Sequence, residues 1–351
     1  MRLAGKAACA ILTTIDNAAL AEKRLAMTTR ISRRNFVKDT ALASAAITVA
    51  VGAKSASAQG KAPQDESRPT TGPLPAVKGA LPKGQIAGVE FSRLIMGGNL
   101  IGGYAHSRDL RYVGQLMKRY NTEQKILETM ELAEVNGITA MNSYVMDGNT
   151  ELQKHWKRGG KMKWFAQVRI DPGGSFSQVT KAADLGATAI HITGDAADAL
   201  MEKGQIEKVG EMMDFIKSKK CIAGIGAHSL PALIECEKRK FNADFYQKTL
   251  HTHDYRSAPG PGETGALGTY DNSWCNDPDE VIEFFWTVKK PFIAFKVMAA
   301  GAIPPRKAFQ HAFNGGADFV LAGMFDWQVE EDCQIAREIL GDVRRTRPWL
   351  G

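Results

Sequence analysis

The stretch Ala187-Thr-Ala-Ile-His-Ile-Thr-Gly-Asp195 is a short apolar run that ends in a histidine, a threonine, a glycine and an aspartate. Helix-period segments flank it, so we predict a buried strand whose polar end opens into a loop. The same order of apolar run, polar or Gly-rich loop and helical segment recurs from about Val89 to Leu340. This repetition predicts a parallel (β/α)8 TIM barrel, in which functional side chains gather at the carboxyl ends of the strands.

Eight apolar runs can be assigned as strands, and a helical segment follows each. One of these helices is expected to begin after Thr122, which is a suitable N-cap residue. Eight strands with their helices fill the chain and leave no room for a second folded domain. The predicted strands span residues 91–99, 137–142, 164–170, 187–195, 222–228, 244–250, 292–297 and 317–323.

The N-terminal region resembles a twin-arginine export signal. Ser32-Arg-Arg-Asn-Phe-Val-Lys38 precedes an apolar segment over residues 40–52, and Ala56-Ser-Ala58 forms a small-residue cleavage site. The apolar segment is too short and too Ala-rich to span a bilayer. The resemblance implies recognition by the twin-arginine export machinery, a periplasmic or otherwise exported protein and no stable membrane span after cleavage. Either Met1 or Met27 can be the start.

We therefore divide the chain into an export signal (1–58), a disordered leader rich in Pro, Gly and Lys (59–85) and a single barrel domain (86–351). The net charge of +7 arises mainly in the signal, which holds nine of the 45 Lys and Arg but three of the 38 Asp and Glu. The remainder is nearly neutral, so the charge does not indicate a nucleic-acid partner. The cysteines of the barrel lack a CxxC pair and are predicted to be mostly free, buried thiols: Cys221, Cys236, Cys275 and Cys333.

Four histidines fall at three successive predicted strand ends, which in a barrel lie on one rim. Converging imidazoles suit Zn²⁺, Mn²⁺ or a similar divalent metal, and nearby carboxylates could complete or orient the site. The histidines could equally act as metal-free acid and base, or satisfy backbone groups. The predicted metal ligands are His191, His228, His251 and His253, with Asp195, Asp254 and Glu263 nearby.

Lys296 ends the predicted strand 292–297, where a charged residue is costly without a partner. It could form a Schiff base, stabilise an enolate or pair with a carboxylate. Polar and aromatic side chains of the rim loops are expected to bind a small-molecule substrate, although the aromatic ones could equally pack the loops onto the barrel. The predicted substrate-binding residues are Asn99, Tyr104, His106, Asn142, Arg169 and Trp274, with Tyr270 and Trp327 as further rim aromatics.

Four segments resemble, in the right order, parts of the aldo-keto reductases, and the resemblance covers about residues 90–341. It implies the barrel of that family. It also implies reduction of a carbonyl with a nicotinamide cofactor, NAD(P), by an Asp, Tyr, Lys and His set in which the tyrosine delivers a proton. The segments are Gly137 to Leu152, Ile190 to Asp195, Ala223 to Ser229 and Val320 to Gly323.

Only His191 matches this catalytic set. Asn142 stands in place of the aspartate and Asp147 in place of the tyrosine, and the strand 164–170 has no lysine in position. An amide cannot lower a neighbouring pKa as a carboxylate–lysine pair does, and an ionised aspartate is a poor proton donor. The usual reduction is therefore not expected, although Tyr144 is close enough in sequence to replace the tyrosine in a shifted alignment.

The sequence thus predicts an exported barrel enzyme that acts on a small polyhydroxylated carbonyl substrate by proton abstraction, elimination or isomerisation. A metal or Lys296 would hold the developing enolate while a histidine moves the proton. The alternatives are an NAD(P)-dependent oxidoreductase of the aldo-keto reductase type and a non-catalytic periplasmic binding protein. The predicted catalytic residues are His191, Lys296, Asp147 and Tyr144.

Overall fold

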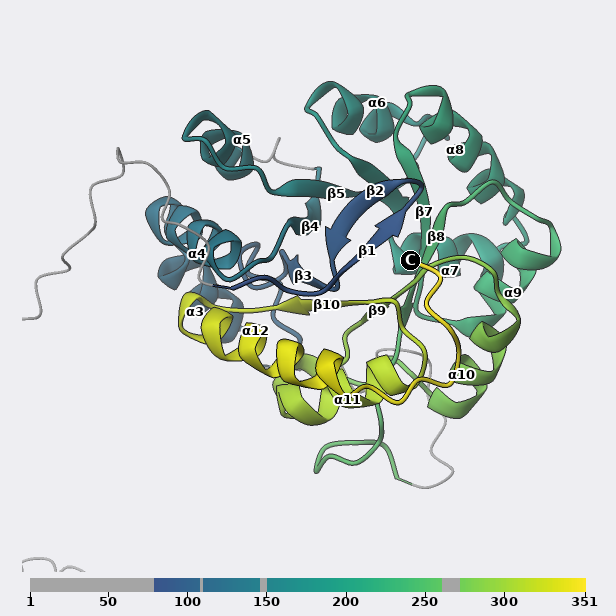
Figure 1. The fold of residues 1–351 in the computed structure, drawn as a ribbon. Coiled ribbons are helices and arrows are strands. Elements are labelled where there is room, and N and C mark those ends of the chain that lie inside the picture. Colours follow the sequence, from purple (N-terminus) through teal and green to yellow (C-terminus); the bar gives the residue numbers. More distant parts are fainter. Residues whose placement is uncertain (1–78, 108–109, 146–149, 261–271) are drawn as a thin grey trace, which may run out of the picture. The chain divides into compact units, whose positions relative to one another are not determined.

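Eight parallel strands form a closed barrel in the order β10-β3-β4-β5-β6-β7-β8-β9, as Figure 1 shows. The structure, a computed structural model, describes residues 79–107, 110–145, 150–260 and 272–351. The predicted TIM barrel is therefore confirmed, and the predicted export signal lies outside the described residues. The strands are β3 (Leu94–Gly97), β4 (Ala140–Tyr144), β5 (Lys163–Val168), β6 (Ala189–Ile192), β7 (Ile222–Ala227), β8 (Phe245–Thr249), β9 (Phe292–Phe295) and β10 (Phe319–Gly323).

Helices surround the barrel (Figure 1). Thr122 caps the N-terminus of α4 as predicted, because its side chain accepts a hydrogen bond from the Lys125 amide. Two connections contain more helix than we predicted: α3 precedes α4, and both α7 and α8 follow β6, separated at Gly204, whose φ is +65°. The helices are α3 (Tyr112–Tyr120), α4 (Glu123–Val135), α5 (Thr150–Lys157), α6 (Ser177–Asp184), α7 (Gly194–Glu202), α8 (Glu207–Ser218), α9 (Leu230–Lys238), α10 (Pro278–Thr287), α11 (Pro305–Asn314) and α12 (Asp326–Gly341), with a short 3-10 turn η1 (Ala299–Gly301).

The first predicted strand, 91–99, is divided in the structure. Its beginning belongs to an antiparallel hairpin of β1 (Lys83–Ile86) and β2 (Val89–Ser92), and only its second part enters the barrel as β3. The hairpin turn is Ala87-Gly88, with φ values of 49° and 80°. Ile86 is fully buried, so the hairpin packs under the barrel from the start of the predicted barrel domain.

The barrel interior is apolar at the level of the hairpin. Aromatic side chains of the hairpin and of two barrel strands pack there: Phe91 lies 4.7 Å from Phe165, which lies 5.5 Å from Phe245, measured between ring centroids. Side chains of one face recur at every second residue, so the next interior position of β4, β5, β6 and β8 is Asn142, Gln167, His191 and Gln247. These four strands therefore carry polar groups toward their carboxyl ends.

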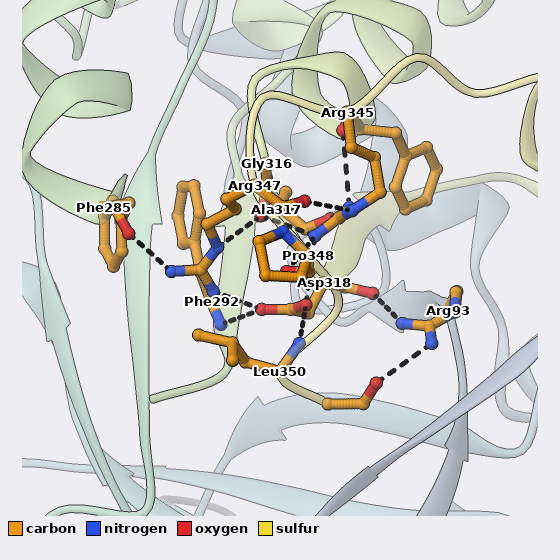
Figure 2. Close-up of polar contacts among 12 residues, drawn as sticks. Arg93, Phe285, Phe292, Gly316, Ala317, Asp318, Arg345, Arg347, Pro348 and Leu350 are labelled. Carbon is orange, nitrogen blue, oxygen red and sulfur yellow. Dashed lines mark hydrogen bonds and ion pairs between the residues drawn. The ribbon is translucent and has the colours of Figure 1, made fainter. Parts of the chain in front are cut away.

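A buried ionic cluster joins the beginning of β3 to the segment after α12 (Figure 2). The carboxylate of Asp318 is fully buried and lies 3.2 Å from Arg345 and 2.5 Å from Arg347. Arg93 donates to the Asp318 carbonyl at 2.9 Å. The Arg93 and Arg345 guanidinium carbons lie 3.5 and 3.4 Å from the ring centroid of Trp349. Burial lowers the pKa of both of these arginines to about 10, so they remain charged at neutral pH.

All four cysteines of the barrel have free thiols, three of them buried, which confirms the prediction. Burial raises the pKa of Cys236 to about 12, so this thiol is not ionised at neutral pH. Among the helices of the described residues, none combines the length and hydropathy needed to cross a bilayer.

Candidate functional site

His191 lies in the first polar layer of the barrel interior and is 1% exposed. Its Nε2 lies 3.0 Å from the Asn142 side-chain oxygen and its Nδ1 3.1 Å from the Ile192 carbonyl. The amide of Asn142 in turn donates to Gln247 at 3.3 Å. Strands β4, β6 and β8 therefore contribute one side chain each to a connected network across the interior.

Burial lowers the pKa of His191 to about 4, so the ring is neutral at physiological pH. A neutral imidazole carries one N–H, and both partners of the ring are oxygen atoms, so the ring donates either to the Ile192 carbonyl or to the Asn142 side-chain oxygen. His191 is thus a neutral, oriented polar group and not a preformed acid.

His228 follows β7 and is oriented by a carboxylate. Its Nδ1 lies 3.1 Å from Asp198 on α7, and the same carboxylate accepts hydrogen bonds from the backbone amides of His228 and Ser229. Burial lowers the pKa of His228, and the charge of Lys296 acts in the same direction. With Nδ1–H donated to Asp198, the Nε2 lone pair of the neutral ring is available as a base.

Lys296, immediately after β9, reaches the barrel mouth. Its ammonium donates to His106 Nε2 at 2.6 Å and lies 4.0 Å from the ring centroid of Trp274. The His228 and His106 rings lie 4.7 and 5.1 Å from the same indole. Lys296 has a φ of 54°, a strained conformation for a residue with a side chain. Such strain concentrates at functional sites. The sequence-predicted residues Lys296, His106 and Trp274 therefore come together.

The other two histidines hold the backbone around Trp274. His251 accepts a hydrogen bond at Nε2 from the Trp274 amide at 2.9 Å and donates through Nδ1 to the Thr252 carbonyl at 3.0 Å. His253 donates to the Cys275 carbonyl at 2.7 Å. Both rings thus bind backbone groups, which is one of the roles considered from the sequence.

The structure does not assemble the four histidines into a metal site. Within residues 79–107, 110–145, 150–260 and 272–351, no three His, Cys, Asp or Glu side chains are placed to hold an ion together. Their ring nitrogens instead contact Asn142, Asp198 and backbone groups. A divalent metal stays a prediction, and Glu263, one of its expected carboxylates, lies outside the described residues.

The opposite wall of the mouth contains two tyrosines and an ion pair. The rings of Tyr104 and Tyr144 are 5.3 Å apart, and Tyr144 bonds to Arg169, which pairs with Asp195. A hollow of about 310 Å³ beside this wall is lined in part by Arg169, Asp195 and Lys203. Burial raises the pKa of Tyr144, whereas its hydrogen bond to Arg169 acts in the opposite direction.

Three sequence-predicted residues have not yet been placed: Asn99, Asp147 and Tyr270. Asp147 lies outside the described residues, as does the rim aromatic Tyr270. Asn99 is half-buried, and its carbonyl accepts the Tyr104 amide at 2.9 Å.

Sequence reasoning missed several polar residues that the site uses. Asp198 lies in a helix whose amphipathic pattern gave no sign that it orients His228. Gln247 and Lys248 are almost fully buried within β8, at 4% and 1% exposure. The sequence did contain a sign of them, because two adjacent long polar residues inside a predicted strand are costly to bury unless they have a role. Alternation also places Gln247 and Thr249 on the interior face with Phe245.

The region after β10 does not fit the phosphates of a nicotinamide cofactor. Helix α12 begins with Asp326 in its first turn, and no Lys or Arg lies between Gly323 and Ala336. The Asp326 carboxylate accepts hydrogen bonds from Tyr120 at 2.6 Å and Lys125 at 3.1 Å. An acidic side chain at a helix N-terminus takes the place that a phosphate would need.

Comparisons with known structures agree on the barrel. Two similar structures are provisionally assigned aldo-keto reductases from Pseudomonas aeruginosa. One has 13% identity and a TM-score of 0.51, and covers 74% of this chain and 95% of its own. The other has 14% identity and a TM-score of 0.50, and covers 74% and 96%. No family model matches this chain, and no curated protein matches it.

The chain therefore has a TIM barrel of the aldo-keto reductase-like type, as the sequence predicts. At this level of identity the likeness shows the fold, and the function has to be argued from the site.

Proposed function

We propose that this barrel is an enzyme that moves a proton at the carbon next to a carbonyl group, in an isomerisation or an elimination. The observation that carries the proposal is the group at the mouth: the Lys296 ammonium, 2.6 Å from His106 and 4.0 Å from the Trp274 ring centroid, with His228 against the same indole. A fixed cation beside a neutral, oriented imidazole is the pair that enolate chemistry needs.

His228 serves as the general base in this proposal. Asp198 holds its Nδ1–H, and its lowered pKa keeps Nε2 unprotonated at neutral pH. The proton leaves the substrate carbon for Nε2, and the electron pair of the broken C–H bond moves to the carbonyl oxygen as an enolate. Lys296 donates a hydrogen bond to that oxygen, and Asp198 stabilises the imidazolium. The proton of the neighbouring hydroxyl then moves to the enolate oxygen, and return of the abstracted proton to the former carbonyl carbon leaves the carbonyl group on the neighbouring carbon and completes an isomerisation.

The proposed substrate is a small polyhydroxylated, sugar-like compound. The side-chain amides of Asn142 and Gln247 lie in the interior below the mouth and can bind hydroxyl groups. Tyr104 in a rim loop and Trp327 in the first turn of α12 are 46% and 67% exposed and present aromatic faces. The Trp274 ring, which we also expected to stack on a sugar, has Lys296 and two histidines against it.

Two further parts of the proposal rest on the sequence. The twin-arginine motif supports export to the periplasm and a requirement for the export machinery. Divalent-metal assistance is proposed only as an addition to the site, and elemental analysis of protein purified without chelators tests it.

The test is solvent-proton exchange. The protein is incubated in D₂O with a panel of ketoses, aldoses and their uronic acids, and NMR follows incorporation of deuterium next to the carbonyl. Wild-type protein should exchange at least one member, and Lys296→Met and His228→Gln should each lower the rate by about 100-fold or more. Lys307→Met is the matched control, because Lys307 is an exposed lysine, 68% exposed, that pairs with Asp254.

The other outcomes reject the proposal, and two of them support one of the alternatives. Full activity in Lys296→Met removes the lysine from the mechanism. No exchange with any substrate, together with binding of NADPH in a fluorescence titration, supports the oxidoreductase alternative. Sugar binding without exchange or nucleotide binding supports the non-catalytic periplasmic binding protein.

A further inference from the structure

Trp274 is the common neighbour of the three groups that make up the proposed reaction centre. Lys296, His228 and His106 each lie against its indole, although they come from three different connections of the barrel. A displacement of Trp274 would therefore move the cation away from the base. What fixes Trp274 also fixes the geometry of the site.

Three side chains at the end of β8 hold the backbone of Trp274 and of the residue after it. Thr249 donates to the Trp274 carbonyl at 2.6 Å, and His251 accepts the Trp274 amide at 2.9 Å. His253 donates to the Cys275 carbonyl at 2.7 Å. The three positions are two residues apart, which is the spacing that places side chains of an extended segment on one face. We name Thr249, His251 and His253 the Trp274 clasp.

Lys248 supports the clasp from behind. It is 1% exposed, and its ammonium donates to the Thr249 hydroxyl at 2.7 Å and to the Thr249 carbonyl at 3.0 Å. No carboxylate of the described residues forms an ion pair with it. Since the hydroxyl accepts from Lys248, its single proton is directed to another acceptor, and the Trp274 carbonyl at 2.6 Å is closer than the His228 carbonyl at 3.2 Å.

We propose that the Trp274 clasp, with Lys248 behind it, is a positioning device that sets the indole so that Lys296 and His228 face the same substrate carbonyl. This inference rests on the proposed function for its purpose, but its structural content does not depend on turnover. The four residues are positioning residues, because none of them needs to touch the substrate. The proposal also gives a role to Lys248, a buried lysine whose desolvation would otherwise be a cost to β8 with no benefit.

Two readouts that need no substrate test the proposal. The first is the near-ultraviolet circular dichroism of Trp274, identified as the band that Trp274→Phe removes. The second is the rate of trace acetylation of Lys296, read by mass spectrometry. Thr249→Val should weaken the Trp274 band and label Lys296 about two- to thirty-fold faster, the range expected when one cation–π contact is lost. Thr249→Ser keeps the hydroxyl and should restore both values.

Thr129→Val is the matched control, because Thr129 is also buried and donates its hydroxyl to a backbone carbonyl, that of Lys125 at 2.7 Å. It should leave both readouts unchanged. Lys248→Met, which fills the same space without charge, should change both readouts in the same direction as Thr249→Val but less. It also serves as the test if Thr249→Val does not fold.

Wild-type values in both Thr249→Val and Lys248→Met would overturn the proposal, and so would equal changes in Thr129→Val. A weakened band with unchanged labelling of Lys296 would also overturn it, because the clasp would then not hold the cation. Absence of substrate exchange in wild-type protein with an intact clasp would count against the proposed function alone.

Discussion

Replacement of Asp318 by alanine should lower the free energy of unfolding of the barrel more than the removal of any other carboxylate. The substitution leaves the guanidinium groups of Arg345 and Arg347, 7% and 3% exposed, buried without their counter-ion. It also removes the acceptor of the Phe292 and Leu350 amides, each at 2.9 Å. Breaking a buried pair from one side costs about 3–5 kcal/mol.

The assay is urea unfolding of the purified protein, followed by circular dichroism. A loss of about 3–5 kcal/mol in the free energy of unfolding corresponds to a fall in Tm of roughly 6–20 °C for a domain of this size. Glu338→Ala is the control, because Glu338 pairs with Arg306 on the surface and should change stability little. A loss below about 1 kcal/mol in Asp318→Ala would refute the reasoning, since the cluster would then not be desolvated.

Three more predictions concern pH, packing and export. Burial lowers the pKa of His191 from 6.5 to about 4. Above pH 6.5 the ring is neutral in both the folded and the unfolded state, so the free energy of unfolding is at its full value there. About 3 kcal/mol should be lost as the pH falls to 4, and His191→Gln should flatten that part of the stability profile. Gly194→Ala would place a methyl 2.9 Å from His228 Cε1, so exchange should fall at least tenfold; unchanged activity would contradict the placement of His228. Replacement of the twin arginines by Arg33→Lys and Arg34→Lys should keep the protein in the cytoplasm. Cell fractionation would measure this.

The fold was predictable because its signal is repeated. Each barrel strand is an apolar run followed by a helical pattern, so errors at the ends, such as 187–195 against β6 at Ala189–Ile192, do not change the topology. The hairpin was missed because its turn, Ala87-Gly88, has alanine where Asn, Asp or Gly is usual, and because its strands are four residues each. Short elements that are fixed by packing under a barrel leave little pattern in the sequence.

The site was predictable only as a set of strand-end residues. Sequence placed Lys296, His106 and Trp274 at the rim, but not against one another, because His106 and Trp274 lie in loops whose paths follow from tertiary contacts. The sequence could not fix how the histidine rings are directed, for a related reason. Adjacent strand ends fix where a residue stands on the rim, whereas the direction of each ring depends on which backbone or carboxylate group lies within reach.

The closure of the barrel has a consequence for the order in which it assembles. Strand β10 pairs with β3, and Arg93 meets Asp318 across 225 positions of sequence. Closing so long a loop costs about 2 kcal/mol more than closing one of about 20 residues. Loss of the Asp318 carboxylate is expected to cost more than this, about 3–5 kcal/mol, so the intact cluster helps to keep the ring closed. We therefore expect the seam between β3 and β10 to form last in folding and to open first in unfolding, while the βα units on either side stay paired.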